Sequence, residues 1–324
     1  MTTALIVAEV GPGVWRIQVP LAFLEPNEVS LYLLRTDEGD ILFDAAMAGS
    51  EDAVDAGLRL AGSDPSEVVR VIVSHEHPDH LGSAGRFGVP VMMHPLTKRL
   101  VERFEQQDPT RFTVFIDRLW LDPSDIPDPS MFDHFRAMLS WPERVEAIED
   151  GDYIAGGWRV VWTPGHSPGH ICLYSAERKT LLAGDHVLPG YTPHVGMDPF
   201  NEDPVGAFVE SLLKVAGYDV DLVLPSHGEP FTDMRAKVDA LTEHHARRLE
   251  QIEAEVREPR TVREVTDAVF RSCESPIDSM MATLEAAAHL VHLELIGKVR
   301  RIDGRRWVGN RTDRVPAGPP RGVT

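Results

Sequence analysis

Residues 75–80 constrain this chain more than any other segment, because they place three histidines and one aspartate within six positions. The segment reads HEHPDH and directly follows a short β-branched run that is typical of a buried central strand. Where a chain leaves a strand and starts a helix, side chains project into one crevice, so His75 and His77 can share a metal ion. Asp79 and His80 can then face a second ion. Imidazole nitrogens and carboxylate oxygens suit Zn²⁺ and similar first-row ions.

Three further ligand-type side chains follow later strands of the predicted fold. They are His166, Asp185 and His227, and each comes after a short apolar run with only a small residue or a turn between. Strand ends of this kind line one edge of a sheet sandwich. Together with residues 75–80 they give five histidines and two aspartates, enough for two metals that share a carboxylate. The alternative is that these seven are polar loop residues with no common role. It requires one motif and three correctly ordered partners to arise by accident.

The order of strands and helices predicts an α/β fold. Strands are expected over 14–19, 30–35, 40–44, 68–73, 89–93, 158–163, 171–175, 180–183 and 222–224. Helices are expected over 51–60 and 205–216. Residues 1–230 would form one catalytic domain. Within it, the Pro-rich segment 95–150 predicts a helical cap insertion whose apolar lining covers the metals, with the aromatic residues Trp120, Phe132, Phe135 and Trp141.

The chain becomes helical after residue 230. An amphipathic stretch over 234–256 predicts a connecting helix within 231–257, and Glu258-Pro259 indicates a boundary. Two helices, over 262–271 and 278–296, then precede two short strands around Gly304. Helix, helix and a two-stranded wing are the outline of a winged-helix domain over 258–312. The Pro- and Gly-rich residues 313–324 predict a disordered tail.

Composition limits which partners the protein can bind and in which cell compartment we expect it. The 324 residues include 51 Asp and Glu against 32 Lys and Arg, a formal net charge of −19, which makes nucleic acid a poor default partner. Two cysteines, Cys172 and Cys273, cannot build a disulfide framework. The start lacks a basic leader, and no stretch approaches the roughly 20 apolar residues of a membrane span. We therefore expect a cytoplasmic protein with no membrane partner.

The seven ligand-type residues resemble the pattern of the metallo-β-lactamase-fold hydrolase superfamily, which is HxHxDH followed by His, Asp and His at strand ends. The resemblance covers roughly residues 14–230 and implies an αββα sandwich. The helix and winged-helix outline after it resemble the lactamase-beta-like branch, which includes ribonuclease and thioesterase members. One metal would be held by His75, His77 and His166. The other would be held by Asp79, His80 and His227, with Asp185 bridging the two.

This resemblance implies a reaction as well as a site. Two cations that share a water or hydroxide lower its pKa and hold it beside a polarised carbonyl or phosphoryl oxygen. Asp79 would orient that nucleophile and carry its proton to the leaving group. We expect hydrolysis of an acyl bond, a thioester, ester or lactone, in a small-molecule substrate. Zinc is the expected ion, with manganese or iron as alternatives.

Redox chemistry is the less favoured reaction. His77 stands where the related diiron oxygen-reducing enzymes carry Glu, so its presence favours hydrolysis. Iron dioxygenases related to this fold keep a similar motif, which leaves the redox alternative open.

Several other residues are weaker candidates. Asp44 is either a partner that orients a ligand histidine or an ordinary turn residue. His170 and His186 lie beside predicted ligands and are either site-edge or structural residues. Tyr191 follows Asp185 by six residues and resembles a tyrosine that N-acyl homoserine lactonases of this superfamily use on the substrate carbonyl.

Four positions are expected to be structural. His94 follows a strand but has no metal left to bind, and Cys172 reads as a small core residue. His244 and His245 lie in a strongly charged helix, which favours a solvated face.

The basic wing supports a competing function. Lys298, Arg300, Arg301, Arg305, Arg306, Arg311 and Arg314 make the end of the chain locally cationic. A metal-dependent ribonuclease or another nucleic-acid-binding protein is therefore the alternative. The net charge and the few cations of the predicted recognition helix oppose it. A wing that packs on the catalytic domain, or on the partner in a homodimer, is the favoured interpretation.

Overall fold

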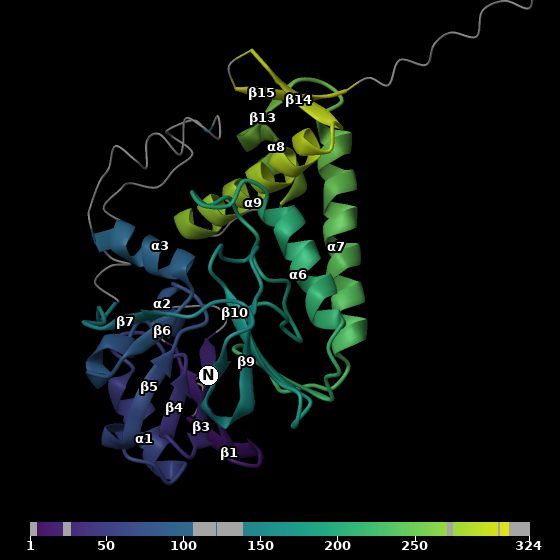
Figure 1. Ribbon diagram of the computed structural model, residues 1–324. Coiled ribbons are helices and arrows are strands. Elements are labelled where there is room, and N and C mark those ends of the chain that lie inside the picture. The colour runs from purple at the N-terminus through teal and green to yellow at the C-terminus, as the bar shows by residue number, and fades with distance from the viewer. Residues whose placement is uncertain are drawn as a thin grey trace, which may run out of the picture.

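A computed structural model of the protein describes residues 5–21, 27–105, 121, 139–270, 275–303 and 305–310. Two β-sheets lie face to face, and helices cover the outer face of each (Figure 1). The αββα sandwich expected from the sequence is confirmed. Among the described helices, none has the length and apolar composition needed to cross a membrane.

Within the described residues, the first sheet has seven strands in chain order. They are β1 (Ile6–Gly11), β2 (Val14–Pro20), β3 (Glu28–Thr36), β4 (Gly39–Phe43), β5 (Val68–Ile72), β6 (Val91–Met93) and β7 (Val145–Ala147). The first four are antiparallel, and β4 to β7 run parallel. Parallel strands end at the same edge of a sheet, so the loop after β5 lies at the edge where β4 and β6 also end.

The second sheet, as far as the chain is described, has five strands in the order β12-β11-β10-β9-β8. They are β8 (Tyr153–Ile154), β9 (Trp158–Trp162), β10 (Ile171–Ser175), β11 (Thr180–Gly184) and β12 (Leu222–Pro225). Strands β11 and β12 pair in parallel. The segment after β9 and the ends of β11 and β12 lie at the same sheet edge, because β9 and β10 are antiparallel and β10 and β11 are antiparallel.

Strand residues alternate between two cores. In β3, Leu31 and Leu33 pack toward α1 (Glu51–Leu60), whereas Tyr32 and Leu34 pack against the second sheet. The same period of two places Cys172 against α6 (Pro204–Ala216) and the start of α7 (Met234–Glu255). Each large apolar side chain that folding removes from water adds about 1.5–3 kcal/mol. Burial on both faces therefore makes the sheets a rigid frame for the loops at their edge.

The C-terminal residues form their own small core beside the end of α7. Helices α8 (Val262–Val269) and α9 (Pro276–Leu295) pack with a three-stranded sheet of β13 (Arg260–Thr261), β15 (Arg306–Gly309) and β14 (Val299–Ile302). Both helices begin with a capping box. The order of elements follows the expectation, and the assignment as a winged helix stays a prediction.

Some details differ from the sequence expectations. The helix over 51–60 and the strand over 171–175 have those bounds as α1 and β10. Strand β7 lies within 95–150, where a helical cap is expected, and it belongs to the first sheet. Its three residues are too few to show a period in the sequence. The short strands β1, β8 and β13 also went unpredicted.

Most of the predicted cap lies outside the described residues. This applies to Trp120, Phe132 and Phe135, and to the predicted tail over 313–324. Trp141 is partly buried and packs on the core of the first sheet.

Candidate metal centre

The predicted ligands converge where the two sheets meet. After β5 the chain passes through Ser74 and His75 into α2 (Pro78–Leu81), which starts on a proline that is pre-set for a first helical turn. Two backbone hydrogen bonds join the sheets at this edge. Ile171 N donates to Ser74 O at 3.0 Å, and Ser30 N donates to Ser226 O at 2.7 Å. The loops from both sheets are thereby held in register.

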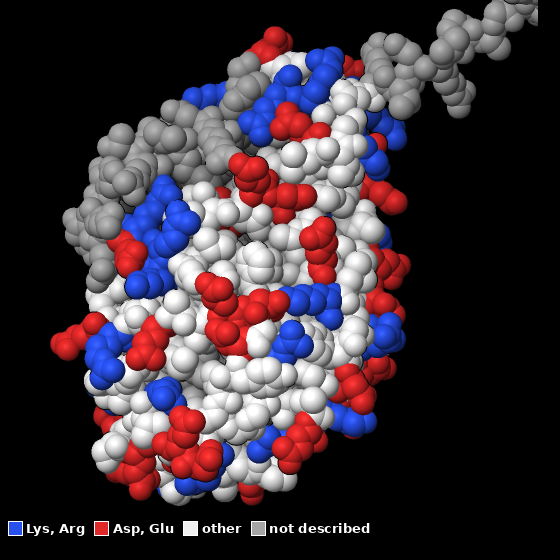
Figure 2. All heavy atoms as spheres, viewed as in Figure 1, with Lys and Arg blue, Asp and Glu red and all other residues white. Residues whose placement is uncertain are grey.

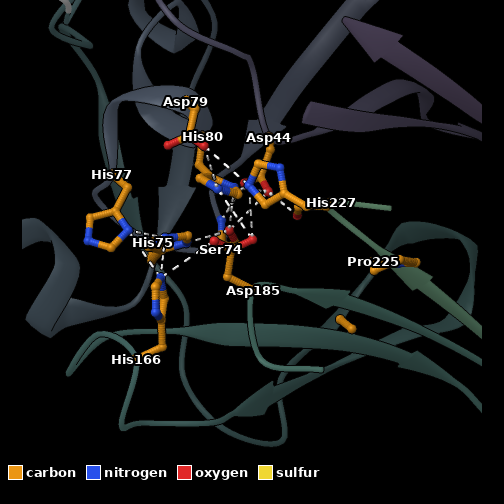
Figure 3. Close-up of polar contacts among 12 residues, drawn as sticks. Asp44, Ser74, His75, His77, Asp79, His80, His166, Asp185, Pro225 and His227 are labelled. Atoms are coloured by element: carbon orange, nitrogen blue, oxygen red, sulfur yellow. Dashed lines mark hydrogen bonds and ion pairs between the residues drawn. The ribbon is translucent and has the colours of Figure 1, made fainter. Parts of the chain in front are cut away.

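The first cluster contains His75, His77, His166 and Asp185. The Nε2 atom of His75 lies 2.7 Å from Nδ1 of His77, and Nε2 of His166 lies 3.2 and 3.1 Å from these two nitrogens. Asp185 Oδ2 lies 3.5 Å from Nε2 of His166. Figure 3 shows the three rings turned toward one point.

The second cluster contains Asp79, His80 and His227. Asp79 Oδ2 lies 3.5 Å from Nε2 of His80 and 3.3 Å from Nε2 of His227. The other oxygen of Asp185, Oδ1, lies 3.5 Å from each of these two nitrogens. Asp185 therefore lies between the clusters, with one oxygen toward each (Figure 3).

The hydrogen bonds around the first cluster indicate where its lone pairs point. His166 Nδ1 donates to the carbonyl of His194 at 2.7 Å, which leaves a lone pair on Nε2. Ser74 Oγ donates to Asp44 and therefore accepts from Nδ1 of His75 at 2.9 Å. Two lone pairs thus converge beside Nδ1 of His77, an arrangement that suits a bound cation.

Buried polar atoms of the second cluster point to the same requirement. His80 Nε2 and Asp185 Oδ1 are buried and make no hydrogen bond with the described residues. First-row divalent cations prefer imidazole nitrogens and carboxylate oxygens, and each cluster offers at least three such atoms. The residues present therefore fit two such ions, and the protein is metal-binding.

Electrostatics differ between the clusters. Burial lowers the pKa of His77 and of His166 to about 4, and it lowers the pKa of His75 well below its usual range. These rings are neutral at pH 7 and ready to bind a cation. Burial acts the same way on His227, yet the carboxylates of Asp185 and Asp79 outweigh it and raise the pKa to about 9. The second cluster thus attracts positive charge more strongly.

Asp44 orients the second cluster. This carboxylate is fully buried and accepts from Nδ1 of His80 at 2.8 Å. It also accepts from the backbone N of Ser74 at 2.7 Å and from Ser74 Oγ at 2.9 Å. Its backbone has a φ of 62°, a left-handed conformation that Asp tolerates better than most residues. The structure therefore favours the orienting role over the ordinary turn residue.

The N-terminal hairpin holds His227. Its Nδ1 donates to the carbonyl of Glu28 at 2.6 Å, and the carboxylate of Glu28 accepts from Gly228 N at 2.9 Å. Arg16 is 4% exposed, and its guanidinium donates to Gly228 O at 2.9 Å and to Glu229 at 2.6 Å. Its Nε donates to Ser30 Oγ at 2.9 Å. These bonds fix the loop that carries His227, a ligand candidate.

The loop before α6 holds His166. The acceptor for His166 is the carbonyl of His194, and the His194 ring donates from Nε2 to Met281 O of α9 at 2.8 Å. The backbone N of Met197 also donates to Leu284 O of α9 at 3.2 Å. A metal-ligand candidate is thereby linked to the C-terminal helix, which crosses above the sandwich in Figure 1.

His170 supports Asp185. Its Nε2 accepts from the backbone N of Asp185 at 3.1 Å, and its Nδ1 donates to Thr163 Oγ1 at 2.7 Å. A Cβ on Gly184 would lie 2.6 Å from Nε2 of His170, so this close approach requires glycine. His186, by contrast, is fully buried against Phe208.

Among the described residues, the remaining candidates make no hydrogen bond or ion pair with the cluster residues. Tyr191 is 43% exposed, and among the described residues its hydroxyl makes no hydrogen bond to a ligand. His94 stacks on Trp162 with ring centroids 5.1 Å apart, as a structural residue would. Cys172 is buried in the second-sheet core as expected.

The expectation of a solvated face is wrong for His245. This ring is fully buried, donates from Nδ1 to Nε2 of His289 at 3.2 Å and packs against Phe208. The physical reason is that α7 packs on α6 and α9, and one stripe of an otherwise charged helix faces them.

Sequence reasoning missed several residues that orient the ligands. They are Arg16, Glu28, Ser74, Thr163 and His194. The only local signal was the position of Ser74 directly before the HEHPDH segment. The others act through contacts that join distant parts of the chain.

Comparisons with known proteins agree with this architecture. The family described as the Metallo-beta-lactamase superfamily matches residues 24–227. The solved structure of a metallo-beta-lactamase family protein from Thermus thermophilus is 28% identical, with a TM-score of 0.81 over 93% of this chain and 100% of that one. A probable metallo-hydrolase of Bacillus subtilis, YqjP, is 24% identical over 86% of this chain and 91% of its own length.

Two thioesterases are also similar to this chain. Acyl-coenzyme A thioesterase MBLAC2 of Homo sapiens is 27% identical over 68% of this chain and 80% of its own. Atrochrysone carboxyl ACP thioesterase of Aspergillus chevalieri is 26% identical over 86% of this chain and 82% of its own.

The αββα fold and the paired His/Asp clusters define a metal-binding hydrolase. The expectation of a metallo-hydrolase enzyme is confirmed. The chain belongs to the metallo-beta-lactamase superfamily. The branch with a winged helix and the choice of zinc stay predictions.

Proposed function

We propose that this enzyme hydrolyses an acyl bond, with a thioester as the preferred substrate and an ester or lactone as the alternatives. The observation that carries the proposal is the carboxylate of Asp185 between two clusters of converging lone pairs. The similarity to two thioesterases favours the thioester among the acyl bonds.

We assign the ligands as the geometry groups them. His75, His77 and His166 would hold one ion, Asp79, His80 and His227 the other, and Asp185 both. Zinc is the expected metal, and manganese or iron would suit the same donors. When bound, the ions supply Lewis acidity, which acidifies a water molecule and polarises the carbonyl oxygen of the substrate.

Asp79 is assigned the proton transfer. Burial opposes its ionisation, but His80 and His227 outweigh it and keep the pKa of Asp79 well below its usual range, so it is a carboxylate at pH 7. It would accept a proton from the attacking water and deliver it to the leaving sulfur. A C–O bond forms, the C–S bond breaks, and the products are a carboxylic acid and a thiol. Tyr191 would donate its hydroxyl hydrogen to the substrate carbonyl.

The first experiment combines metal analysis with a substrate panel of thioesters, esters, lactones and RNA. We expect two divalent ions per chain and the highest kcat/KM on a thioester. In Asp79→Asn, kcat should fall by about 10²- to 10⁴-fold because the proton acceptor is lost. His94→Asn, which removes a buried histidine outside the clusters, is the control. A metal-loaded protein that hydrolyses no acyl bond would refute the proposal.

Contacts of the basic wing weigh against the nucleic-acid alternative. Several of its cations are paired within the chain: Lys298 with Glu253 at 2.8 Å, Arg301 with Glu294 at 3.0 Å and Arg306 with Asp303 at 2.7 Å. Arg305 donates to the carbonyl of Leu121. Paired cations release fewer counterions from a phosphate backbone. RNA binding that weakens steeply with salt would instead support the alternative.

A further inference from the structure

Helix α3 (Pro95–Glu105) lies directly against the loop that carries His166. The buried hydroxyl of Thr97, in its first turn, donates to Gly169 O at 3.0 Å. A Cβ on Gly169 would lie only 2.2 Å from that hydroxyl oxygen, so helix and loop are in van der Waals contact. Gly169 is three residues after His166, so α3 begins close to a metal-ligand candidate.

Two arginines of α3 share one aromatic ring. Arg99 and Arg103 are four positions apart and so lie on the same face of the helix. Their guanidinium carbons lie 4.7 and 5.7 Å from the ring centre of Phe200. Lys98 on the same helix is paired with Glu102 at 3.9 Å, so the two arginines carry the argument. In Figure 2, blue side chains gather over the position that α3 has in Figure 1, beside an uncharged area of the surface.

Phe200 is fixed in the loop that also orients His166. Its backbone N donates to Asp198 Oδ1 at 2.7 Å, and Asn201 N donates to the same oxygen at 2.8 Å. The same loop supplies the His194 carbonyl that accepts from His166. The paired guanidinium groups and the first ligand cluster are thus connected through one short segment of backbone.

The chemistry of this pair suits a phosphate. A guanidinium that stacks on a ring keeps its N–H groups directed outward in its own plane, where they can donate in pairs to phosphate oxygens. Arg99 is exposed and forms no ion pair with any described carboxylate. The chain has a net charge of −19, so most of its surface repels phosphate. The two arginines therefore give this face of α3 an attraction for phosphate that the chain as a whole lacks.

We infer that Arg99 and Arg103 bind a phosphate of the leaving group, so that the substrate is a thioester of a phosphate-bearing thiol. This inference rests on the proposed function. It assigns the acyl part to the metal clusters and the thiol part to the face of α3 that carries the two arginines.

The test compares two thioesters with the same acyl group, one of coenzyme A and one of N-acetylcysteamine, which lacks phosphates. In the double variant Arg99→Ala/Arg103→Ala, kcat/KM for the coenzyme A thioester should fall about tenfold or more, while the value for the short thioester stays unchanged. Replacing both arginines by lysine should give an intermediate loss, because the charge remains but the paired donors do not. Arg59→Ala, an exposed arginine on α1, is the control.

Direct binding keeps this inference separable from the proposed function. Calorimetry with adenosine 3′,5′-bisphosphate should detect binding to the wild type that weakens with salt and is lost in the double variant. An equal loss on both thioesters, or no loss on either, would overturn the phosphate site. If the wild type cleaves no thioester but binds the bisphosphate through these arginines, the proposed function fails and the phosphate site stands.

Discussion

The two ligand clusters face the same aspartate but are held by different parts of the molecule. In the second cluster, His80 is fixed by the buried carboxylate of Asp44, and His227 by backbone groups that the first sheet positions. In the first cluster, His166 depends on a loop carbonyl whose anchor is helix α9. One cluster is thus built into a sheet, and the other relies on a loop and a C-terminal helix. We expect the second to be the more rigid.

The strongest test of this difference is Asp44→Asn. Asparagine tolerates the left-handed backbone at this position but offers one acceptor where four donors converge. Metal affinity at the second cluster should fall about 10- to 100-fold. The unfolding free energy of the metal-free protein should fall by about 1–3 kcal/mol because a buried donor loses its partner. Two-step zinc calorimetry and urea unfolding measure both.

Asp40→Asn is the matched control for that variant. Asp40 is also buried and accepts from Ser63 at 2.6 Å, but it lies in β4 away from both clusters. It should lower stability and leave both zinc affinities unchanged. If Asp44→Asn weakened the two clusters equally, the contrast between them would be wrong.

Arg16→Ala should have the next largest effect. The variant removes the donors to Gly228 O and Glu229, so the loop that carries His227 loosens. Zinc affinity should fall about tenfold at the second cluster alone. Arg35→Ala is the control, since Arg35 also donates to backbone carbonyls, at Ala61 and Gly62, but among the described residues forms no hydrogen bond or ion pair with either ligand-bearing loop. The same calorimetric titration distinguishes the outcomes.

His194→Ala should affect the other cluster. The His194 carbonyl remains, but its ring no longer donates to Met281 O, so the acceptor of His166 becomes less fixed. We expect a loss of about three- to tenfold in zinc affinity at the first cluster. His292→Ala is the control, because His292 also joins α9 to this loop but contacts Asp203, which caps α6. If both variants changed zinc affinity equally, α9 would not be what positions His166.

The smallest expected effect is a change of stability with pH at the buried pair His245–His289. This pair lies outside both clusters, so it shows what burial alone does to a histidine. Burial lowers the pKa of each ring to about 3, whereas unfolded histidine has a pKa of about 6.5. The unfolded chain therefore binds more protons between these values, and stability falls as pH falls below about 6.5. From pH 7 to pH 6 each ring should cost about 0.7 kcal/mol.

His245→Phe isolates the contribution of one ring. Its unfolding free energy should fall less steeply than that of the wild type between pH 7 and pH 5. Between pH 8 and pH 9, where His245 binds no proton in the folded or the unfolded state, the two curves should run parallel. A wild-type slope in the variant would mean that His245 is not buried in its neutral form.

The sequence predicts the seven ligand-type residues because metal chemistry restricts them to few residue types at strand ends. The residues that orient them carry no such mark. Arg16 and Gly228 are 212 positions apart, and an arginine that donates to a carbonyl looks like any surface arginine before folding.

His245 did leave a signal in the sequence. The buried residues of α7 include Val238, Leu241, His245 and Ile252, whose spacings of three, four and seven mark one helical face. The high charge of that helix concealed the stripe. Strand β7 shows the opposite limit, since a three-residue strand has too few positions to display any period.

Ser74 connects the two clusters through one hydroxyl group. Its single hydroxyl lies 2.9 Å from Nδ1 of His75 and 3.4 Å from Nδ1 of His80, one ring from each cluster, while donating to Asp44. Fixing either ring therefore restricts this hydroxyl and, through it, the other ring. A substitution of Ser74 should therefore disturb one ring of each cluster, whereas the changes at Arg16 and His194 act on one cluster each.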